Sequence, residues 1–365
     1  MEALVATRGV LSRAISAVSS KPIGQGCEVK RIPLPIVSDR QILVNVHAVA
    51  LNPIDFISID RLAPRGSVVG CDYAGEVAEV GKNAPSSWKV GDRVAGFLHG
   101  GHYSDRGSFC KYLTIDGDLA WRVPDGLGYE EASTYGVAAA TAMLGLSVHL
   151  GIPLLDTPST DLTTQPQATE SRGTVLIYSG STSVGLFAIQ LAKRSGYTVV
   201  TTASPHSFDL VKKYGADSVF DYRSKTAAQD ISKAFPNITQ AFDCISKGAS
   251  TEFCAQVLEK NGGKIVTLLD QGKSKTKGVE YKFIVIFTAL GEAFGWLPPI
   301  GPSFPASPSD RDALVRFYAD LPSYGDVVKP PPLRVLGSGF DKILTGLQDL
   351  RGGKVSGQKL VVKLE

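Results

Sequence analysis

The sequence predicts an α/β protein, with a β-rich domain joined to a domain built on a doubly wound parallel sheet. The first observation is an apolar, β-rich run at 174–178 that ends in a turn of small residues at 179–185. A helical pattern follows at 186–195 and a second apolar run at 197–202, and together these indicate a β-turn-α-β unit. The second observation is that residues 1–125 contain short strand-like runs broken by glycine and proline, which is typical of a separate β-rich domain.

The elements of the first domain follow from its apolar pattern. Strands are expected at 41–50, 68–80 and 93–97, where apolar residues alternate or run together between glycines. From about residue 126 to residue 150 the pattern becomes helical and rich in alanine. The stretch 153–172 holds many proline, serine, threonine and glutamine residues, so we expect a solvated surface loop there.

Alternating strand and helix patterns continue through the second domain. Repeated units of this length favour a parallel, doubly wound sheet. The proline-rich stretch 296–308 marks the exit from this domain, and a final strand at 360–364 is expected to rejoin the first domain's sheet. The expected boundaries are 1–140 with 310–365 for the first domain and 141–309 for the second. Within the second domain we expect strands at 174–178, 197–202, 218–221, 240–245 and 264–269, and helices near 184–195, 206–214, 226–234 and 250–260.

Composition and charge exclude several classes of protein. The chain has 365 residues, 43% hydrophobic and 20% charged, which is ordinary for a globular protein with two domains. A net charge of +3 is too small to indicate a protein directed at nucleic acids or membranes. The N-terminus lacks the apolar core of a signal peptide, and the most apolar later run, 283–290, is too short to span a bilayer. The cysteines Cys27, Cys71, Cys110, Cys244 and Cys254 form no CxxC pair, which is typical of a reduced, cytoplasmic protein.

The turn at 179–185, with the sequence SGSTSVG, predicts a dinucleotide site. It places a helix N-terminus where a pyrophosphate can sit, although it is not a full GxGxxG motif. Gly180 can support the tight turn, and Gly185 lets the helix pack close to its strand. Ser181, Thr182 and Ser183 add hydroxyl donors to the backbone N–H groups. The alternative is an ordinary strand-to-helix turn in a protein that binds no nucleotide.

The residues after the second apolar run indicate which dinucleotide binds. Proteins specific for NAD usually carry an aspartate or glutamate there, and this chain has no carboxylate before Asp209. Ser204, His206 and Ser207 could instead donate hydrogen bonds to a 2′-phosphate, with the lysines at 212–213 adding positive charge. This pattern favours NADPH. The same serine followed by proline also fits helix capping, and both roles can hold together.

Three motifs in the first domain resemble the medium-chain dehydrogenase/reductase superfamily. They are VNVHAVALNPID at 44–55, GCDYAGEV at 70–77 and VGDRV at 90–94, and the resemblance covers nearly the whole chain. It implies a GroES-like β-rich domain, a Rossmann domain that binds the nucleotide, and C-terminal strands that return to the first domain.

The zinc ligands of that superfamily's alcohol dehydrogenases are not matched. The corresponding positions here are Asn52, Cys71 and Val137, and an amide, one thiol and an aliphatic side chain cannot supply the three ligands that catalytic zinc needs. The four-cysteine structural zinc cluster is missing too. The histidines show no metal spacing, and we expect His99 and His102 to be surface or loop residues. These features place the chain with the zinc-free quinone and enoyl reductases, with no metal.

A narrower resemblance is to the fungal trans-acting enoyl reductases of polyketide biosynthesis, the group that includes the lovastatin enoyl reductase. It lies in TASPHSFDL at 202–210, FDYR at 220–223, FDCI at 242–245 and GQKLVV at 357–362. It implies transfer of a hydride from NADPH to the β-carbon of an α,β-unsaturated thioester in secondary metabolism. The implied partner is the carrier domain of a polyketide synthase or hybrid synthase.

The same resemblance implies a set of site residues. The catalytic residues would be Asn52, Asp55 and Thr141. The substrate-binding residues would be Thr141, Ala142, Met143, Leu144, Thr288, Ala289, Leu290, Gly291 and Glu292. The cofactor-binding residues would be Ile54, Asp55, Phe56, Ile57, Ser181, Thr182, Ser183, Val184, Ser204, Pro205, His206, Ser207, Tyr222, Leu269, Asp270, Val355 and Ser356.

Several alternatives stay open at this point. Relatives often carry lysine where this chain has Ile57, so the proton donor is not identified. Asp55 could simply cap a helix, Thr141 could bond to its own helix, and Tyr222 could lie over the core. The segment 288–296 could serve dimerisation. A free-standing NADPH quinone oxidoreductase and a non-redox accessory protein remain alternative functions.

Overall fold

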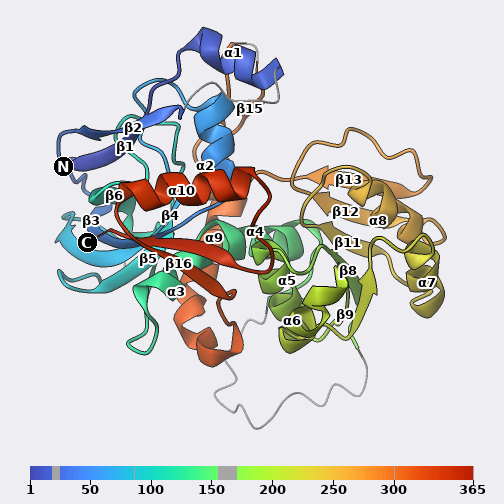
Figure 1. Cartoon of the computed structure of the whole chain (residues 1–365). Coiled ribbons are helices and arrows are strands. Elements are labelled where there is room, and N and C mark those ends of the chain that lie inside the picture. Colours follow the sequence, from blue (N-terminus) through green and yellow to red (C-terminus); the bar gives the residue numbers. More distant parts are fainter. Residues whose placement is uncertain (19–24, 86, 155–170, 300, 365) are drawn as a thin grey trace. The chain divides into compact units, whose positions relative to one another are not determined.

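The computed structural model describes residues 1–18, 25–85, 87–154, 171–299 and 301–364, which form two compact units (Figure 1). Unit 1 is Met1–Val137 with Phe287–Pro322 and Pro332–Glu365. Unit 2 is Ala138–Ile286 with Ser323–Pro331. Most of the loop expected at 153–172 lies outside the described residues. No helix of the described residues has both the length and the apolar character needed to cross a membrane.

The units divide at different places from the boundaries we expected at 140/141 and 309/310. The segment 287–309 belongs to unit 1. The reason is a set of contacts within that unit: Phe287 stacks on His99 with ring centroids 3.8 Å apart, and Glu292 pairs with Arg106 at 3.2 Å. The exit from the second domain therefore precedes the prolines at 296–308.

Unit 1 is built on a mixed sheet with the strand order β16-β17-β3-β4-β5-β7, and β6 also pairs with β3. The C-terminal strand β17 pairs antiparallel with β3, with Val361 opposite Ala50, so the prediction that the last strand rejoins this sheet is confirmed. The pairs β1–β2 and β14–β15 form two further small sheets. The strands of unit 1 are β1 (Glu2–Ala6), β2 (Cys27–Arg31), β3 (Gln41–Ala50), β4 (Asp72–Val80), β5 (Arg93–Phe97), β6 (Tyr112–Asp116), β7 (Ala120–Arg122), β14 (Phe294–Gly295), β15 (Ser303–Phe304), β16 (Leu333–Ser338) and β17 (Lys359–Lys363).

The strand expected at 68–80 begins only at Asp72. Gly70 interrupts it with a φ of 93°, in the left-handed region, and a Cβ there would lie 2.3 Å from the Phe109 ring. The helices of this unit are α1 (Val10–Val18), α2 (Pro53–Ile57), α3 (Tyr129–Ala132), α9 (Pro308–Asp320) and α10 (Phe340–Arg351), with a π-helical turn η1 (Ser58–Leu62) and 3₁₀ turns η2 (Gly117–Leu119) and η3 (Ser133–Tyr135).

Unit 2 contains an all-parallel sheet with the strand order β10-β9-β8-β11-β12-β13 (Figure 1). The chain builds outward from β8 in one direction and then restarts at β11 on the other side, which confirms the doubly wound prediction. The strand order reverses between β8 and β11, and sheets of this kind bind ligands at the carboxyl ends of the strands at such a switch point. The strands are β8 (Thr174–Tyr178), β9 (Thr198–Ala203), β10 (Ser218–Asp221), β11 (Gln240–Asp243), β12 (Gly263–Thr267) and β13 (Val279–Phe283).

The helices of the second domain begin and end within about two residues of their predicted positions. The apolar strand residues are buried because helices cover a parallel sheet, as Leu176, Val200 and Ile265 show in its core. Besides α4 (Val137–Met143), whose first residue is in unit 1, the helices are α5 (Ser183–Arg194), α6 (Phe208–Lys213), α7 (Ala227–Ala234) and α8 (Ser250–Leu258), with the π-helical turn η4 (Leu144–His149) and the 3₁₀ turn η5 (Pro205–Ser207); the 3₁₀ turns η6 (Ile286–Leu290) and η7 (Leu321–Val327) cross the unit boundaries.

Candidate functional site

The turn after β8 is shaped by close backbone contacts. Its left-handed residue is Ser179, with a φ of 61°, rather than Gly180, to which we had assigned the tight turn. Gly180 is instead where the turn touches β9, since a Cβ there would lie 2.1 Å from the Thr201 hydroxyl oxygen. A Cβ on Gly185 would lie 2.6 Å from the Ser179 carbonyl oxygen, so that glycine lets α5 pack close to the strand end as predicted.

The N-terminus of α5 is capped by Thr182. Its hydroxyl donates to the Ser179 carbonyl at 2.9 Å and accepts from the Gly185 N–H at 3.0 Å. Of the three hydroxyl groups expected to face a phosphate, that of Thr182 is therefore used to shape the turn. Ser181 and Ser183 flank it and are half-buried. The first N–H groups of this twelve-residue helix have no partner within the helix and can meet an anion.

Ser204 and Tyr222 meet at the carboxyl ends of β9 and β10, with their hydroxyl oxygens 3.3 Å apart. Tyr222 is 40% exposed, so it is not the buried core aromatic of the alternative reading. Ser204 also occupies the N-cap of η5 with Pro205 following it, although its side chain makes no cap hydrogen bond. Ser207 is buried inside this turn, whereas His206 is exposed.

The parallel sheet brings the predicted cofactor residues of unit 2 to one edge. They directly follow the carboxyl ends of β8, β9, β10 and β12, which share that edge in a parallel sheet. The residues are Ser181, Thr182, Ser183, Val184, Ser204, Pro205, His206, Ser207, Tyr222, Leu269 and Asp270.

Asp243 is a residue of this edge that our sequence analysis did not single out. It is fully buried at the end of β11, and its carboxylate accepts hydrogen bonds from the hydroxyls of Ser250 and Thr251, both at 2.6 Å. It also accepts from the Ser246 N–H at 2.8 Å, and the Ser246 hydroxyl in turn accepts from the Leu268 N–H at 2.9 Å. This network fixes the chain just before the predicted cofactor contacts at 269–270. The sequence did contain a signal for this network, because an aspartate ends the strand β11 and two hydroxyl residues begin the next helix, α8.

Thr141 and the predicted substrate-binding segment that it begins lie at a change of helix type. Residues 141–144 are all buried, and α4 changes at Leu144 from α-helical to π-helical hydrogen bonding. The helix α2, which carries Asp55, is likewise followed directly by the π-helical turn at 58–62. π-Helical turns are rare in proteins as a whole, and those that do occur are often found at functional sites.

Unit 1 holds a buried polar cluster around Asn52. The Asn52 amide donates to Asp72 at 2.9 Å and to the Ala50 carbonyl at 3.3 Å, while its oxygen accepts from the Lys359 ammonium. Lys359 also pairs with Asp72 at 3.3 Å, and Asp72 accepts from the Val137 N–H at 2.6 Å. Because its amide is engaged at both ends, Asn52 is suited to positioning its neighbours. Neither Asp72 nor Lys359 was among the predicted site residues.

Asp55 caps the helix α2, as one alternative proposed. Its carboxylate accepts from the Asn52 N–H at 2.7 Å, and the side chain is almost completely buried. The pKa of Asp55 is raised to about 7. Burial is the main cause and the nearby Asp72 adds to it, while the Asn52 N–H, Cys71 and Lys359 act in the opposite direction. The group can therefore hold or release a proton near neutral pH.

We expect Asp55 to make the stability of the protein depend on pH. Its folded pKa of about 7 lies above the ordinary 3.8, so the folded state holds this proton more tightly and the wild type loses stability as the pH rises between those values. Asp55→Asn removes that loss, so its stability relative to the wild type should increase by a few kcal/mol across the window. Urea unfolding measured at several pH values tests this, with the exposed Asp209→Asn as control. A difference between Asp55→Asn and the wild type that stays constant with pH would contradict it.

The three positions that match zinc ligands do not fit a metal ion. Asn52 is bound to the Lys359 ammonium, whose positive charge would repel a cation. Burial raises the pKa of the Cys71 thiol well above its ordinary value, which disfavours the thiolate that zinc needs. Val137 offers no side-chain ligand. Among the residues that the structure describes, no group of three His, Cys, Asp or Glu side chains could hold a metal ion.

The remaining predicted residues of unit 1 lie in three places. Ile54, Phe56 and Ile57 are half-buried around Asp55 on α2, and the Arg351 guanidinium lies 5.4 Å from the centre of the Phe56 ring. Residues 355–356 lie in the turn between α10 and β17. Residues 288–292 follow the unit boundary, and there the Thr288 hydroxyl donates to Asp310 at 2.5 Å while Ala289 is fully buried.

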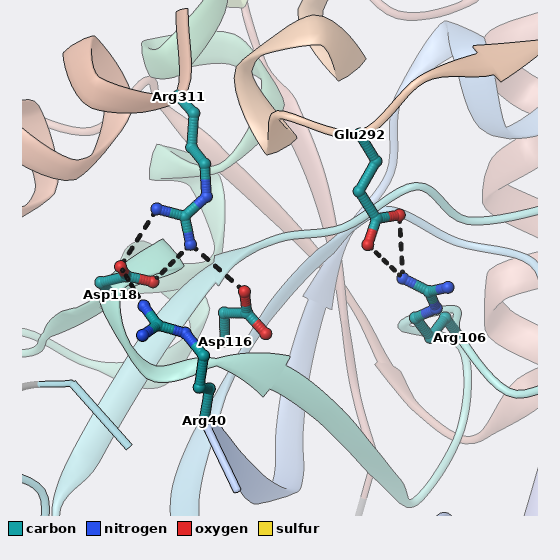
Figure 2. Close-up of polar contacts among 6 residues, drawn as sticks. All are labelled: Arg40, Arg106, Asp116, Asp118, Glu292 and Arg311. Carbon is teal, nitrogen blue, oxygen red and sulfur yellow. Dashed lines mark hydrogen bonds and ion pairs between the residues drawn. The ribbon is translucent and has the colours of Figure 1, made fainter. Parts of the chain in front are cut away.

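The segment 287–294 lines a cavity of about 160 Å³ within unit 1. Figure 2 shows two separate sets of ion pairs that belong to its lining and surroundings. In one, Arg311 donates to Asp116 at 3.2 Å and to Asp118 at 2.8 Å. In the other, Arg106 donates to both oxygens of Glu292 at 3.2 and 3.3 Å. His99 lies in this wall, in the loop that follows β5 as expected, but it is buried rather than at the surface.

Comparisons with known proteins agree with this architecture. The family model described as "Alcohol dehydrogenase GroES-like domain" matches residues 38–125, and that described as "Zinc-binding dehydrogenase" matches residues 183–277. Among solved structures, the CurK enoyl reductase has a TM-score of 0.70 at 18% identity and covers 100% of this chain and 99% of its own. An alcohol dehydrogenase superfamily protein from Novosphingobium aromaticivorans has a TM-score of 0.74 at 21% identity, with both chains covered fully. These likenesses show a GroES-like domain joined to a Rossmann domain.

Closer likeness is found in sequence. The trans-enoyl reductase ACTTS2 of Alternaria alternata is 37% identical over 93% of this chain and 96% of its own length. The trans-enoyl reductase TOXD of Cochliobolus carbonum is 42% identical over 72% of this chain and 85% of its own. The enoyl reductase component lovC of the lovastatin nonaketide synthase of Aspergillus terreus is 36% identical over 91% of this chain and 92% of its own length. The chain therefore belongs to the trans-enoyl reductases, within the medium-chain dehydrogenase/reductase superfamily.

Proposed function

We propose that this chain is an NADPH-dependent, zinc-independent enoyl reductase that acts in trans. Its substrate would be an α,β-unsaturated thioester on the carrier domain of a polyketide synthase or hybrid synthase. The observation that carries the proposal is the carboxyl edge of the unit 2 sheet. The capped N-terminus of α5 follows β8 at this edge, and the hydroxyls of Ser204 and Tyr222 meet after β9 and β10. No aspartate or glutamate stands between Ala203 and Asp209. The names of the relatives support the reaction class.

The residues of unit 2 fit a bound NADPH. The N–H groups at the start of α5, with Ser181 and Ser183, would face the pyrophosphate. The paired hydroxyls of Ser204 and Tyr222, with the exposed His206, would face the adenosine end and its 2′-phosphate. A solved relative in fold, mycobacterial Rv1454c, is described as complexed with NADPH. When bound, the cofactor supplies a hydride for the β-carbon of the substrate.

The protein's part in the reaction is to position the substrate, exclude water and handle one proton. We propose that the Thr141 hydroxyl donates to the thioester oxygen, where negative charge develops as the β-carbon is reduced. Asp55 is the proposed residue with a pKa suited to delivering the proton, since Ile57 has no ionisable group. Asn52 holds the N-terminus of α2 and the Lys359 ammonium in place rather than acting on substrate.

We expect the corner at Ser204 to decide between the two nicotinamide cofactors. In Ser204→Asp, a carboxylate at the end of β9 would repel a 2′-phosphate and bind ribose hydroxyls. The affinity for NADPH should fall about tenfold or more, while the affinity for NADH should hold or rise. Calorimetric titration of both cofactors measures this, and Ser204→Asn serves as the uncharged control. A Ser204→Asp variant that still prefers NADPH as strongly as the wild type would place the 2′-phosphate elsewhere.

The reaction itself is tested by following nicotinamide absorbance with different acceptors. The enzyme should consume NADPH with crotonyl-pantetheine and form butyryl-pantetheine, with NADH much the poorer donor. Turnover of a small quinone but of no enoyl thioester would make the protein a quinone oxidoreductase. Binding of NADPH without consumption by either acceptor would indicate a non-redox accessory protein.

A further inference from the structure

Two loops at the carboxyl edge of the unit 2 sheet are joined through Ser246. One loop follows β11 and the other follows β12, which is its neighbour in the parallel sheet. The Ser246 hydroxyl accepts a hydrogen bond from the Leu268 N–H at 2.9 Å, and the Ser246 carbonyl accepts one from the Gln271 side chain at 3.0 Å. Ser246 of the first loop therefore holds the second loop on both sides of residues 269–270.

The backbone of Ser246 has a conformation that needs support. Its φ of 50° lies in the left-handed region, which residues other than glycine rarely adopt. The Asp243 carboxylate provides this support, because one of its oxygens accepts from the N–H groups of Ser246 at 2.8 Å and Ile245 at 3.2 Å. The Ser246 hydroxyl also donates to the Asp243 carbonyl at 3.0 Å. Residues held in such conformations cluster at functional sites.

The Asp243 carboxylate is itself held in place. Its second oxygen accepts from the hydroxyls of Ser250 and Thr251, which lie in the first turn of α8. These three side chains and that of Ser246 are at most 3% exposed. Hydrogen bonds to both oxygens and the nearby N-terminus of α8 compensate the buried negative charge. The position of Ser246 is thereby fixed from the interior of unit 2.

The two loops present apolar side chains at their surface. Ile245 is 40% exposed and Leu269 is 38% exposed, and each lies two residues beyond the end of its strand. Side chains of this kind can pack against the flat face of a ring. The loops therefore combine an apolar surface with a rigid, hydrogen-bonded support.

We propose that Ser246 is a positioning residue for the nicotinamide half of the cofactor, which it serves by holding Leu269 and Asp270 in place. The inference rests on the proposed function. A dinucleotide lies across the point where the strand order reverses, with one half on each side. The hydroxyls of Ser204 and Tyr222, which follow β9 and β10, are assigned to the adenosine end. The nicotinamide half therefore falls to the side of β11 and β12.

Ser246→Gly tests the proposal, because glycine keeps the left-handed backbone and removes only the hydroxyl. The Leu268 N–H then loses its acceptor, and residues 269–270 can shift. Calorimetric titration should show an affinity for NADPH about five- to tenfold below that of the wild type. The affinity for adenosine 2′,5′-bisphosphate, which contains the adenosine end alone, should change less than about twofold. The kcat with crotonyl-pantetheine should fall about tenfold, since the hydride donor is displaced from the β-carbon.

Ser195→Gly is the matched control. Ser195 is similarly buried in unit 2, and its hydroxyl donates to the Leu191 carbonyl at 2.8 Å. It lies at the C-terminal end of α5, away from the turn assigned to the pyrophosphate. This variant should bind NADPH and adenosine 2′,5′-bisphosphate as the wild type does, with an unchanged kcat.

The outcomes separate the two proposals. Weaker binding of NADPH by Ser246→Gly, with unchanged binding of adenosine 2′,5′-bisphosphate, supports the positioning role. Equal losses for both ligands would indicate a general disturbance of unit 2, and wild-type values for NADPH affinity and kcat would show that the hydroxyl positions nothing. Either of these results overturns the inference while leaving the enoyl reductase in place. A wild type that binds neither ligand overturns the proposed function and this inference with it.

Discussion

Lys359→Met is expected to lower the free energy of unfolding by about 3–5 kcal/mol. The Lys359 ammonium is buried against Asp72 at 3.3 Å and donates to the Asn52 oxygen. Removing it leaves the Asp72 carboxylate uncompensated in a site from which water is excluded, and burial already raises the pKa of that carboxyl. Urea unfolding at neutral pH measures the loss.

The double variant Asp72→Asn/Lys359→Met should recover much of that stability, because it removes the unpaired charge along with its partner. Lys363→Met, in the same strand, is the matched control. Its ammonium pairs with Glu130 at 2.8 Å but is 38% exposed, so the loss there should stay below about 1 kcal/mol. If Lys359→Met lowered the free energy of unfolding no more than Lys363→Met, Lys359 would not be compensating a buried charge on Asp72.

Gly185→Ala is expected to weaken NADPH binding by about tenfold to a hundredfold. Its new Cβ would lie 2.6 Å from the Ser179 carbonyl oxygen and 2.7 Å from the Gly180 Cα, both backbone atoms that cannot rotate away. The start of α5 must therefore move from the turn, and its N–H groups lose their aim at the pyrophosphate. Fluorescence titration with NADPH measures the loss of affinity.

Gly126→Ala is the control for this variant. Gly126 has nothing within 4 Å of its added Cβ, so neither stability nor NADPH affinity should change appreciably. Thermal unfolding of both variants separates a local effect on the turn from general unfolding. A folded Gly185→Ala protein that binds NADPH as tightly as the wild type would show that the pyrophosphate does not lie at this turn.

The local pattern of the second domain was sufficient to predict five of the six strands of its sheet, but not the edge strand β13, where charged residues interrupt the apolar pattern. Buried parallel strands are continuous apolar runs, and each predicted run of unit 2 is a strand in the structure. The role of Gly180 was harder to predict from the sequence. The left-handed residue of the turn is Ser179, and Gly180 is needed because Thr201 of the next strand approaches it closely. That contact depends on tertiary packing.

The buried cluster of unit 1 could not be predicted from the sequence. Asn52 and Lys359 are 307 residues apart, and neither position carries a local periodic or capping signal for the other. The same is true of Arg106 and Glu292, which are 186 residues apart and were expected to lie in two different domains. Such contacts follow from the topology of the fold: the first depends on the return of the C-terminal strand to β3, and the second on the return of residues 287–322 to unit 1.

The most direct measurement is the fate of deuterium carried at both hydrogen positions of the nicotinamide C4 of NADPH, so that the transferred hydride is labelled whichever face of the ring reacts. The enzyme is given this cofactor and crotonyl-pantetheine in ordinary water, and the product is examined by NMR. The proposed function predicts deuterium at the β-carbon of butyryl-pantetheine and a hydrogen from water at the α-carbon. Deuterium at the α-carbon, or a saturated product without the label, would contradict it.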